Sequence, residues 1–152
     1  MDIKVEGADK LGRLAKDLRR LGDKDLQKEL YAGLNRATKT LRADGVQAER
    51  DRLPKEGGLA KKALRGRMST RRRGGRWPGV RIVARGIKQL DRIDRLGKVR
   101  HPVYGHRGRW VDQSIPGAKG WFTDTMEAGA PTVREELVKV IDDVARKVTR
   151  KL

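Results

Sequence analysis

The chain has 152 residues, which suits a single domain over residues 1–152, and it has no cysteine, which excludes a disulfide framework and thiolate metal sites. Its formal net charge is +18, from 38 basic and 20 acidic residues, so we expect acidic partners. Apolar residues make up only 36%, against a usual share of about 45–50%, so we expect the chain to gain burial by assembling with copies of itself or with an acidic partner.

The N-terminal third is predicted to be mainly helical. Asp2–Glu6 alternates apolar and charged residues, which predicts a short strand and is not the apolar core of a secretory leader. Leucines at positions 11, 14, 18 and 21 have the spacing of an amphipathic helix, which Gly22 ends. A second helix is predicted over Asp23–Arg52, with Asp23 as its cap and Gly45 as a candidate site for a bend. No apolar run approaches the roughly 18 residues of a membrane span.

A break and a hairpin are predicted next. Pro54 cannot continue the preceding helix, so the chain turns there. A short basic helix is expected over Leu59–Arg65. Residues 66–76 read as a polar strand with a glycine-rich basic tip, and Gly79–Arg85 alternates as a second strand, so the two are expected to pair as a hairpin.

Two further helical segments are expected in the C-terminal half. Leu90–Leu96 has helical spacing and is stopped by Gly97. Thr123–Ala128 is expected to add one turn, and a last helix is expected over Pro131–Lys151, because proline suits a first helical position and the charges run from acidic to basic. The expected fold is α+β, with a small antiparallel sheet flanked by two long helices. The residues predicted to be buried are Leu30, Leu34, Leu41, Leu137, Ile141 and Val144.

The segment Lys98–Phe122 differs from the rest in composition. It holds both histidines, one of two tyrosines, two of three tryptophans and the only phenylalanine. Its prolines and glycines predict fixed turns, and centres of interfaces are enriched in aromatic residues and arginine. We therefore predict a structured loop or hairpin that contacts another subunit or a neighbouring protein. The predicted contact residues are Arg100, His101, Tyr104, Arg107, Arg109, Trp110, Trp121 and Phe122.

An alternative for these aromatic residues is that they close the end of the protein's own core. Both can hold for different residues, with Trp110 inside and Trp121 and Phe122 reaching outward. The argument for the interface is that the leucines and valines of the helices already suffice to fill a core of this size.

A second candidate surface is basic and surrounds the tip of the first predicted hairpin. Arginine and lysine neutralise phosphate without reading sequence, so this surface is a candidate contact for DNA or for an acidic protein. The alternative is a solvated basic loop. The residues concerned are Arg65, Arg67, Arg71, Arg72, Arg73 and Arg76, with Trp77 beside them.

No catalytic, cofactor-binding or metal-binding residues are predicted. His101 and His106 are five positions apart, but a zinc site needs two more ligands, and Asp112 is the nearest acid. Ser69 and Ser114 are the only serines, and neither lies in a nucleophile-elbow pattern. Phosphate-loop and dinucleotide-binding fingerprints are absent from the sequence. We therefore do not expect an enzyme.

Two parts of the chain resemble a known family. The opening IKVEGADKLGRLAKDL, a long helix and then LPKEGGLAKKAL resemble the neck and tail-completion family of long-tailed bacteriophages. Glu6-Gly7 matches the end of that family's first strand, and Pro54, Gly58 and Leu59 match its turn. Gly57 stands where that turn usually has threonine. The stretch RHPVYGHRGRWVDQ…GWF is similar to the version found in phages of actinobacteria.

The resemblance implies a non-enzymatic virion protein at the head–tail junction, assembled in the bacterial cytoplasm. It implies a ring of identical subunits through which double-stranded DNA passes, with neck, connector or tail-tube proteins as neighbours. It does not fix the copy number, which we expect to be six or twelve. One alternative is a small basic protein that binds nucleic acid without sequence preference, but neither a recognition helix nor an aromatic sheet platform is evident. A toxin or nuclease would need an acid–histidine set that the sequence does not supply.

Overall fold

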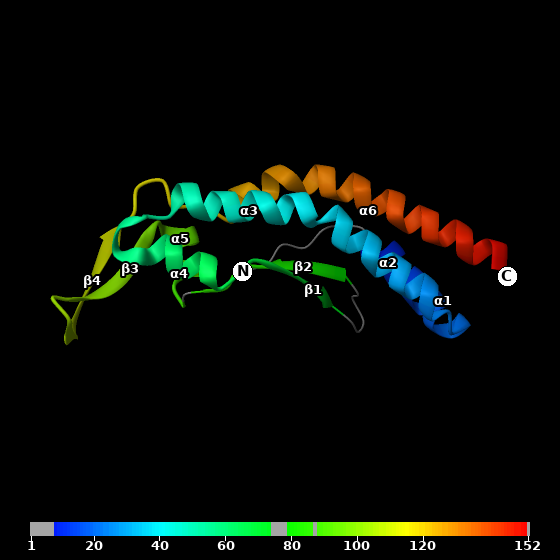
Figure 1. Ribbon diagram of the computed structural model, residues 1–152, viewed down its shortest axis with the longest axis horizontal. Helices are drawn as coiled ribbons and strands as arrows, with labels where there is room; N and C mark the ends of the chain where they lie inside the picture. Colours follow the sequence, from blue (N-terminus) through cyan, green and yellow to red (C-terminus); the bar gives the residue numbers. More distant parts are fainter. Residues whose placement is uncertain (1–7, 74–78, 87, 152) are drawn as a thin grey trace.

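The computed structural model describes residues 8–73, 79–86 and 88–151 of the chain. The described part is elongated, with long helices side by side and two β-hairpins, and it has the expected α+β class (Figure 1). The strand predicted at Asp2–Glu6 lies outside the described residues. The helices are α1 (Ala8–Leu21), α2 (Lys24–Ala37), α3 (Lys39–Arg52), the short 3-10 helix η1 (Glu56–Gly58), α4 (Leu59–Arg65), α5 (Leu90–Leu96) and α6 (Thr123–Lys151). The strands are β1 (Ser69–Arg73), β2 (Gly79–Val83), β3 (Lys98–Val103) and β4 (His106–Ser114).

The boundary between the first two helices agrees with the prediction. Gly22 adopts a left-handed conformation, with φ of 67°, and ends α1. The Asp23 carboxylate then accepts hydrogen bonds from the backbone N–H groups of Asp25 (3.1 Å) and Leu26 (2.9 Å), which caps α2.

The helix predicted over Asp23–Arg52 is in fact two helices, which meet at Thr38. The Thr38 hydroxyl donates to the Leu34 carbonyl (3.1 Å) and lies 3.3 Å from the Thr70 hydroxyl of β1. Such back-bonding competes with the helical pattern and bends helices. Gly45 is not a bend, because α3 runs through it. A Cβ at Gly45 would collide with Met68 Sδ and lie 2.8 Å from Met126 Cε, so the glycine permits close packing instead.

The prediction that the last helix begins at Pro131 is also wrong, because α6 runs without interruption from Thr123. The start is fixed by Asp94 of α5, which is distant in sequence and buried. Asp94 Oδ1 accepts from the backbone N–H groups of Phe122 (2.7 Å) and Thr123 (3.1 Å), and Oδ2 accepts from the Thr123 hydroxyl (2.5 Å). Negative charge at a helix N-terminus is favourable, so Asp94 stabilises a helix that begins at Thr123. The turn expected at 123–128 is therefore the first part of the last helix.

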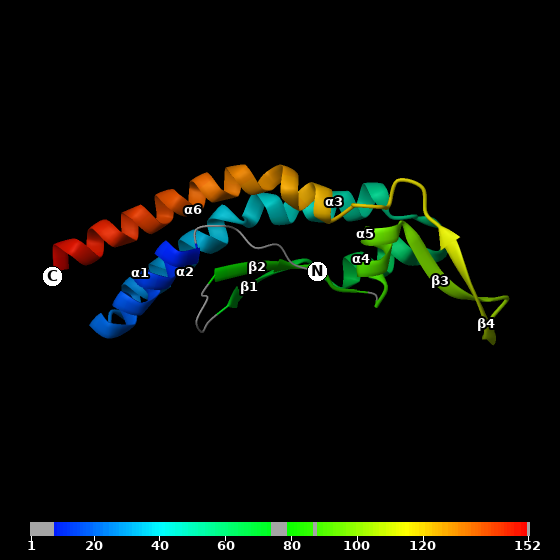
Figure 2. The same ribbon diagram turned by 180° about the vertical axis from the view of Figure 1, so that it is seen from behind.

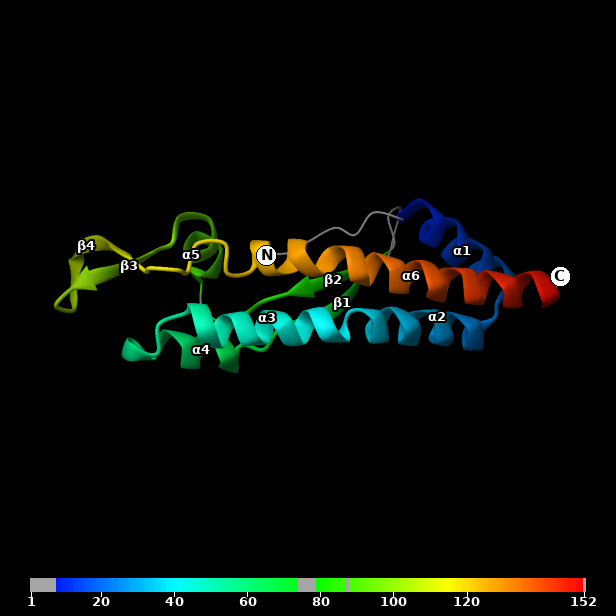
Figure 3. The same ribbon diagram turned by 90° about the horizontal axis from the view of Figure 1, so that it is seen from above.

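Helices α2 and α3 follow each other in one row, and this row runs alongside α6 (Figure 3). The core lies mainly between the row and α6. All six residues predicted to be buried in the two long helices are buried. An exposed ion pair between Glu29 and Lys147 also joins α2 to α6. At the start of α6, Trp121 and Phe122 extend this core, with an edge-to-face contact of 5.6 Å between ring centroids.

Two separate two-stranded antiparallel hairpins stand in place of the expected single sheet. The β1–β2 pairing runs from Ser69↔Val83 to Arg73↔Gly79, which confirms the predicted first hairpin. Ile82 of β2 is buried against the helical core. The second hairpin joins β3 to β4 within the aromatic segment.

Candidate interaction surfaces

Strands β3 and β4 form a hairpin that extends from the end of the molecule opposite the C-terminus (Figure 2). We call Lys98–Ser114 the projecting hairpin. All nine residues of β4 are exposed, so neither face of this strand packs on the body. A two-stranded hairpin with no covering layer is at best marginally stable in water. Val99 of β3 packs against the core, so it is the outer part of the projecting hairpin that offers its faces and strand edges to a partner.

The tip of the projecting hairpin carries an aromatic residue under backbone strain. Tyr104 and Gly105 form a two-residue turn, with φ values of 46° and 78°. Turns of this kind need φ above zero at both positions, which asparagine and glycine tolerate better than tyrosine. The Tyr104 side chain is 97% exposed. A tyrosine that is strained and fully exposed is not stabilised by packing against its own chain. Such a residue is typical of a site that contacts a partner.

An irregularity in β4 displays two arginines. Pro102 pairs with Trp110 while the next residue, Val103, pairs with His106, so the three residues 107–109 bulge out of the ladder. The Trp110 indole N–H donates to the Arg107 carbonyl (2.7 Å) and closes the bulge. Bulges re-aim side chains away from the regular strand alternation. Arg107 and Arg109 are exposed, and Trp110 is 46% exposed beside them.

The root of the projecting hairpin is held by α5. The Gln89 side chain just before α5 accepts from the Arg100 backbone N–H and donates to the Arg100 carbonyl, both at 2.7 Å. Arg92 forms an ion pair with Asp112 of β4 at 2.6 Å. These contacts fix the direction of the hairpin at its base and leave its outer part unpacked.

The structure divides the predicted interface residues into two groups. Arg100, His101, Tyr104, Arg107, Arg109 and Trp110 lie together on the projecting hairpin. Trp121 and Phe122 do not reach outward: they are 0% and 1% exposed and belong to the protein's own core. The expected division is thus reversed, because Trp110 is the outer tryptophan. The physical reason is that the turn over residues 115–120 is attached to the body and carries the two aromatic side chains into it.

A basic cleft of about 900 Å³ lies between α3 and α4. Among the described residues that line it, Asp51 is the only acid, and it accepts hydrogen bonds from Gln47 at 3.0 Å. The basic residues that line it are Arg50, Lys55, Lys61, Arg65 and Arg67. The structure therefore brings together Arg65 and Arg67 of the predicted basic surface and adds Arg50, Lys55 and Lys61. Lys61 lies on α4 four positions before Arg65, and the sequence already placed it beside the basic run. Spacing did not indicate Arg50 and Lys55, because they come from separate elements.

The remaining basic candidates lie on or beyond β1. Arg71 is exposed and pairs across the hairpin with Arg81. Arg72 and Arg73 belong to β1 by their backbone, and Arg76 lies outside the described residues, as does Trp77.

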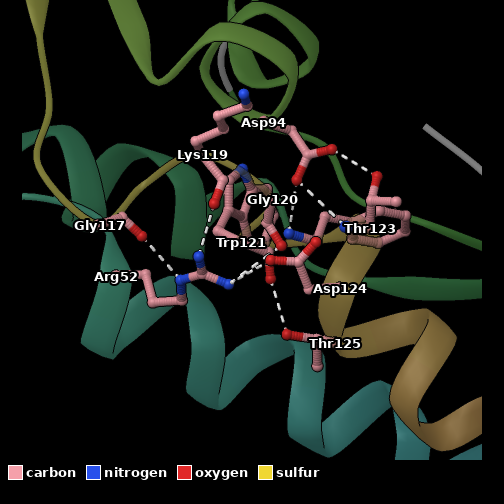
Figure 4. A network of polar contacts seen from close by, with 10 residues as sticks. Arg52, Asp94, Gly117, Lys119, Gly120, Trp121, Thr123, Asp124 and Thr125 are labelled. Atoms are coloured by element: carbon pink, nitrogen blue, oxygen red, sulfur yellow. Dashed lines mark hydrogen bonds and ion pairs between the residues drawn. The ribbon is translucent and has the colours of Figure 1, made fainter.

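Arg52 is a positioning residue that the sequence did not reveal. It lies at the end of α3, and its guanidinium donates to the carbonyls of Gly117 (2.7 Å), Lys119 (2.5 Å) and Gly120 (3.0 Å), as Figure 4 shows. Together with Asp94 it attaches the turn over residues 115–120 to the helices. No local pattern predicts this network, because Arg52 lies more than 60 positions before the carbonyls that it binds.

Glu49 of α3 is fully buried, and its two carboxyl oxygens have no hydrogen-bond partner within the described part of the chain. Burial disfavours the charged form and raises the pKa of Glu49 to about 7. At neutral pH this group is therefore divided between its neutral and charged forms.

Within residues 8–73, 79–86 and 88–151, no group of three or more histidine, aspartate or glutamate residues is arranged to hold a metal ion. No helix in those ranges has the length and apolar character to cross a membrane. Comparison with protein-family models, curated proteins and solved structures finds no significant match to this chain.

Proposed function

We propose that this chain is a structural subunit of a bacteriophage virion, which forms a ring at the head–tail junction and surrounds the DNA channel. The observation that carries the proposal is the projecting hairpin, an aromatic and basic element whose outer strand is exposed throughout and whose root is held by α5. An element of this kind is expected in a protein that works as part of an assembly. The order of the neck-family sequence features supports the same assignment.

The charge distribution suits a subunit that lines a DNA channel. A net charge of +18 keeps a ring lumen from repelling the phosphate backbone. The basic cleft between α3 and α4 concentrates five basic side chains on one surface. Contacts of this type are independent of base sequence, as passage of a whole genome requires.

The basic cleft also favours the alternative function, a basic protein that binds nucleic acid without sequence preference and without forming a ring. The two functions differ in the state of the protein in the absence of DNA. A ring subunit assembles through protein contacts, whereas the alternative needs DNA to bring copies together.

Imaging of the purified protein by negative-stain electron microscopy tests the proposal. We expect closed rings with a central channel in nuclease-treated samples. A protein that remains a monomer at all accessible concentrations, and binds DNA as a monomer, would contradict the ring and favour the alternative.

The contribution of the basic cleft is tested by the salt dependence of binding to duplex DNA. Replacing Arg65 and Arg67 with serine is expected to reduce the slope of log K against log salt by about 1 for each phosphate that the variant no longer touches. The same measurement on Arg71→Ser, Arg72→Ser and Arg73→Ser together tests the first hairpin. Serine at Arg13 and Arg19, which are exposed on α1, is the matched control. An unchanged slope in both test variants would leave these arginines as solvated residues.

A further inference from the structure

We infer that the projecting hairpin of one copy docks in a groove between the α2–α3 row and α6 of the next copy. This inference rests on the assembly part of the proposed function and specifies the two surfaces that meet. It does not depend on whether the assembly belongs to a virion.

The receiving groove has a volume of about 610 Å³. Its lining includes the apolar side chains of Leu41, Val133 and Val140 from the two helical rows. The charged residues that line it are three acids, Asp44, Glu136 and Asp143, and two bases, Arg36 and Lys139. Glu136 is paired with Lys139 at 2.8 Å, and Asp143 is paired with Arg146. The groove thus has one more acid than bases, and the exposed Asp44 is its one lining carboxylate that forms no ion pair within the described residues.

The charges of the two surfaces are complementary. In a chain of net charge +18, the described residues that line the groove carry a formal charge of −1, from three acids and two bases. The projecting hairpin carries four basic residues and one acid, Asp112, which is already paired with Arg92. Opposite potentials of this kind orient two surfaces during encounter and fix their register.

The apolar parts are complementary as well. Trp110 and Tyr104 are the large exposed side chains of the projecting hairpin, and they flank the arginine bulge. Tryptophan, tyrosine and arginine dominate binding energy when they enter a pocket from which water is excluded. Leu41 and Val133 are almost fully buried, so the apolar surface that the groove offers comes from the partly buried Ala37 and Val140.

The groove that receives the hairpin belongs to a second copy because the hairpin cannot reach its own. Gln89 and Arg92 hold its root, and it points away from the body (Figures 1 and 3). The groove is lined by residues of α2, α3 and α6, along the body. Each copy therefore has one hairpin to give and one groove to receive. Contacts between two different surfaces join copies head to tail, which closes into a ring when the rotation between copies permits.

Charge reversal on each side, followed by mixing, tests the inference. The hairpin variant is Arg107→Glu with Arg109→Glu, and the groove variant is Asp44→Arg with Glu136→Arg. Each alone is expected to raise the apparent dissociation constant for self-association by at least about tenfold, because like charges meet. An equimolar mixture is expected to assemble again, since a reversed hairpin then meets a reversed groove. Mass photometry measures all three samples.

Matched reversals elsewhere serve as controls: Arg13→Glu with Arg19→Glu, and Asp17→Arg with Asp25→Arg, all exposed on α1 or α2. Circular dichroism establishes that each variant is folded. If the wild type assembles and both test variants assemble as well as it does, the hairpin–groove contact is wrong while the ring remains. If the wild type never self-associates, and the hairpin instead binds a different protein, both proposals are overturned.

The absence of cysteine permits a direct second measurement. Arg109→Cys with Thr132→Cys places one thiol on the bulge and one in the groove. Under mild oxidation we expect intermolecular disulfides that appear as a ladder in non-reducing electrophoresis. Arg109→Cys with Thr149→Cys, whose second thiol lies on α6 outside the groove, is expected to cross-link much less. Equal cross-linking of the two pairs would overturn the inference.

Discussion

Two neighbouring parts of one aromatic segment differ in how far their aromatic side chains are buried. The projecting hairpin, Lys98–Ser114, exposes Tyr104 and Trp110, whereas the turn that follows it buries Trp121 and Phe122 completely. Both parts are rich in aromatic residues and glycine, and they are joined directly. Composition therefore does not decide which aromatic residues belong to the core.

The difference lies in how each part is attached to the helices. The turn is attached along its length, because Arg52 binds three of its carbonyls and Asp94 binds the backbone at the start of α6. The projecting hairpin is attached at its root, through Gln89 and Arg92. The comparison teaches that a few long-range hydrogen bonds to backbone groups separate a core segment from a segment that is available to a partner.

The strongest way to test the comparison is to truncate the buried tryptophan. Trp121→Ala should lower the free energy of unfolding by about 3–5 kcal/mol, because it leaves a cavity in the core. Chemical denaturation of the variant, in buffer that keeps the wild type monomeric, measures this change. A loss below about 1 kcal/mol would mean that Trp121 is not the core residue that its burial indicates.

The local features of the fold were predictable from sequence. Leucine spacing identified α1, and the spacing of valine, isoleucine and leucine residues identified the apolar face of α6. Asp23 identified a cap, and the alternation at Gly79–Arg85 identified β2. These features depend on residues within about one turn or one strand of each other, where spacing carries the information.

Long-range features were not predictable. The start of α6 depends on Asp94, which lies 29 positions before Thr123, so Pro131 was the only visible local signal and it was misleading. The burial of Trp121 depends in the same way on Arg52 and Asp94. The sequence predicted a structured loop or hairpin in the aromatic segment, but it could not tell which aromatic residues lie on the hairpin and which lie in the core.

The pH dependence of stability tests the burial of the Glu49 side chain, which lies on α3. Burial raises the pKa of Glu49 from 4.5 to about 7, so the folded state holds a proton that the unfolded state has released. The free energy of unfolding should therefore fall as pH rises from 4.5 to 7, by about 3 kcal/mol in total, and level off above pH 7. Glu49→Gln should remove this decrease, since glutamine does not ionise. Denaturation of both proteins at pH 4, 6 and 8 measures it, and parallel pH profiles would contradict the assignment.

Removal of the distant cap is expected to have a smaller effect. Asp94→Ala should lower the free energy of unfolding by about 2 kcal/mol, because the backbone N–H groups of Phe122 and Thr123 lose their acceptor. Asp91→Ala on the exposed side of the same helix is the control and should change stability by no more than about 0.5 kcal/mol. The melting temperatures of Asp94→Ala and Asp91→Ala measure this difference in stability. Equal melting temperatures would mean that Asp94 does not define the start of α6.

The smallest effect on stability, and the most direct test of the central claim, is expected at Trp110. We expect the free energy of unfolding of Trp110→Ala to lie within about 1 kcal/mol of the wild-type value. The reason is that the side chain is half-exposed and lies outside the core cluster of the described residues. The decisive measurement is the native mass by light scattering after size-exclusion chromatography. The account predicts a folded Trp110→Ala monomer under conditions in which the wild type forms oligomers. A variant that still forms oligomers of the wild-type mass, or one that fails to fold, would contradict the claim that the projecting hairpin is an assembly contact.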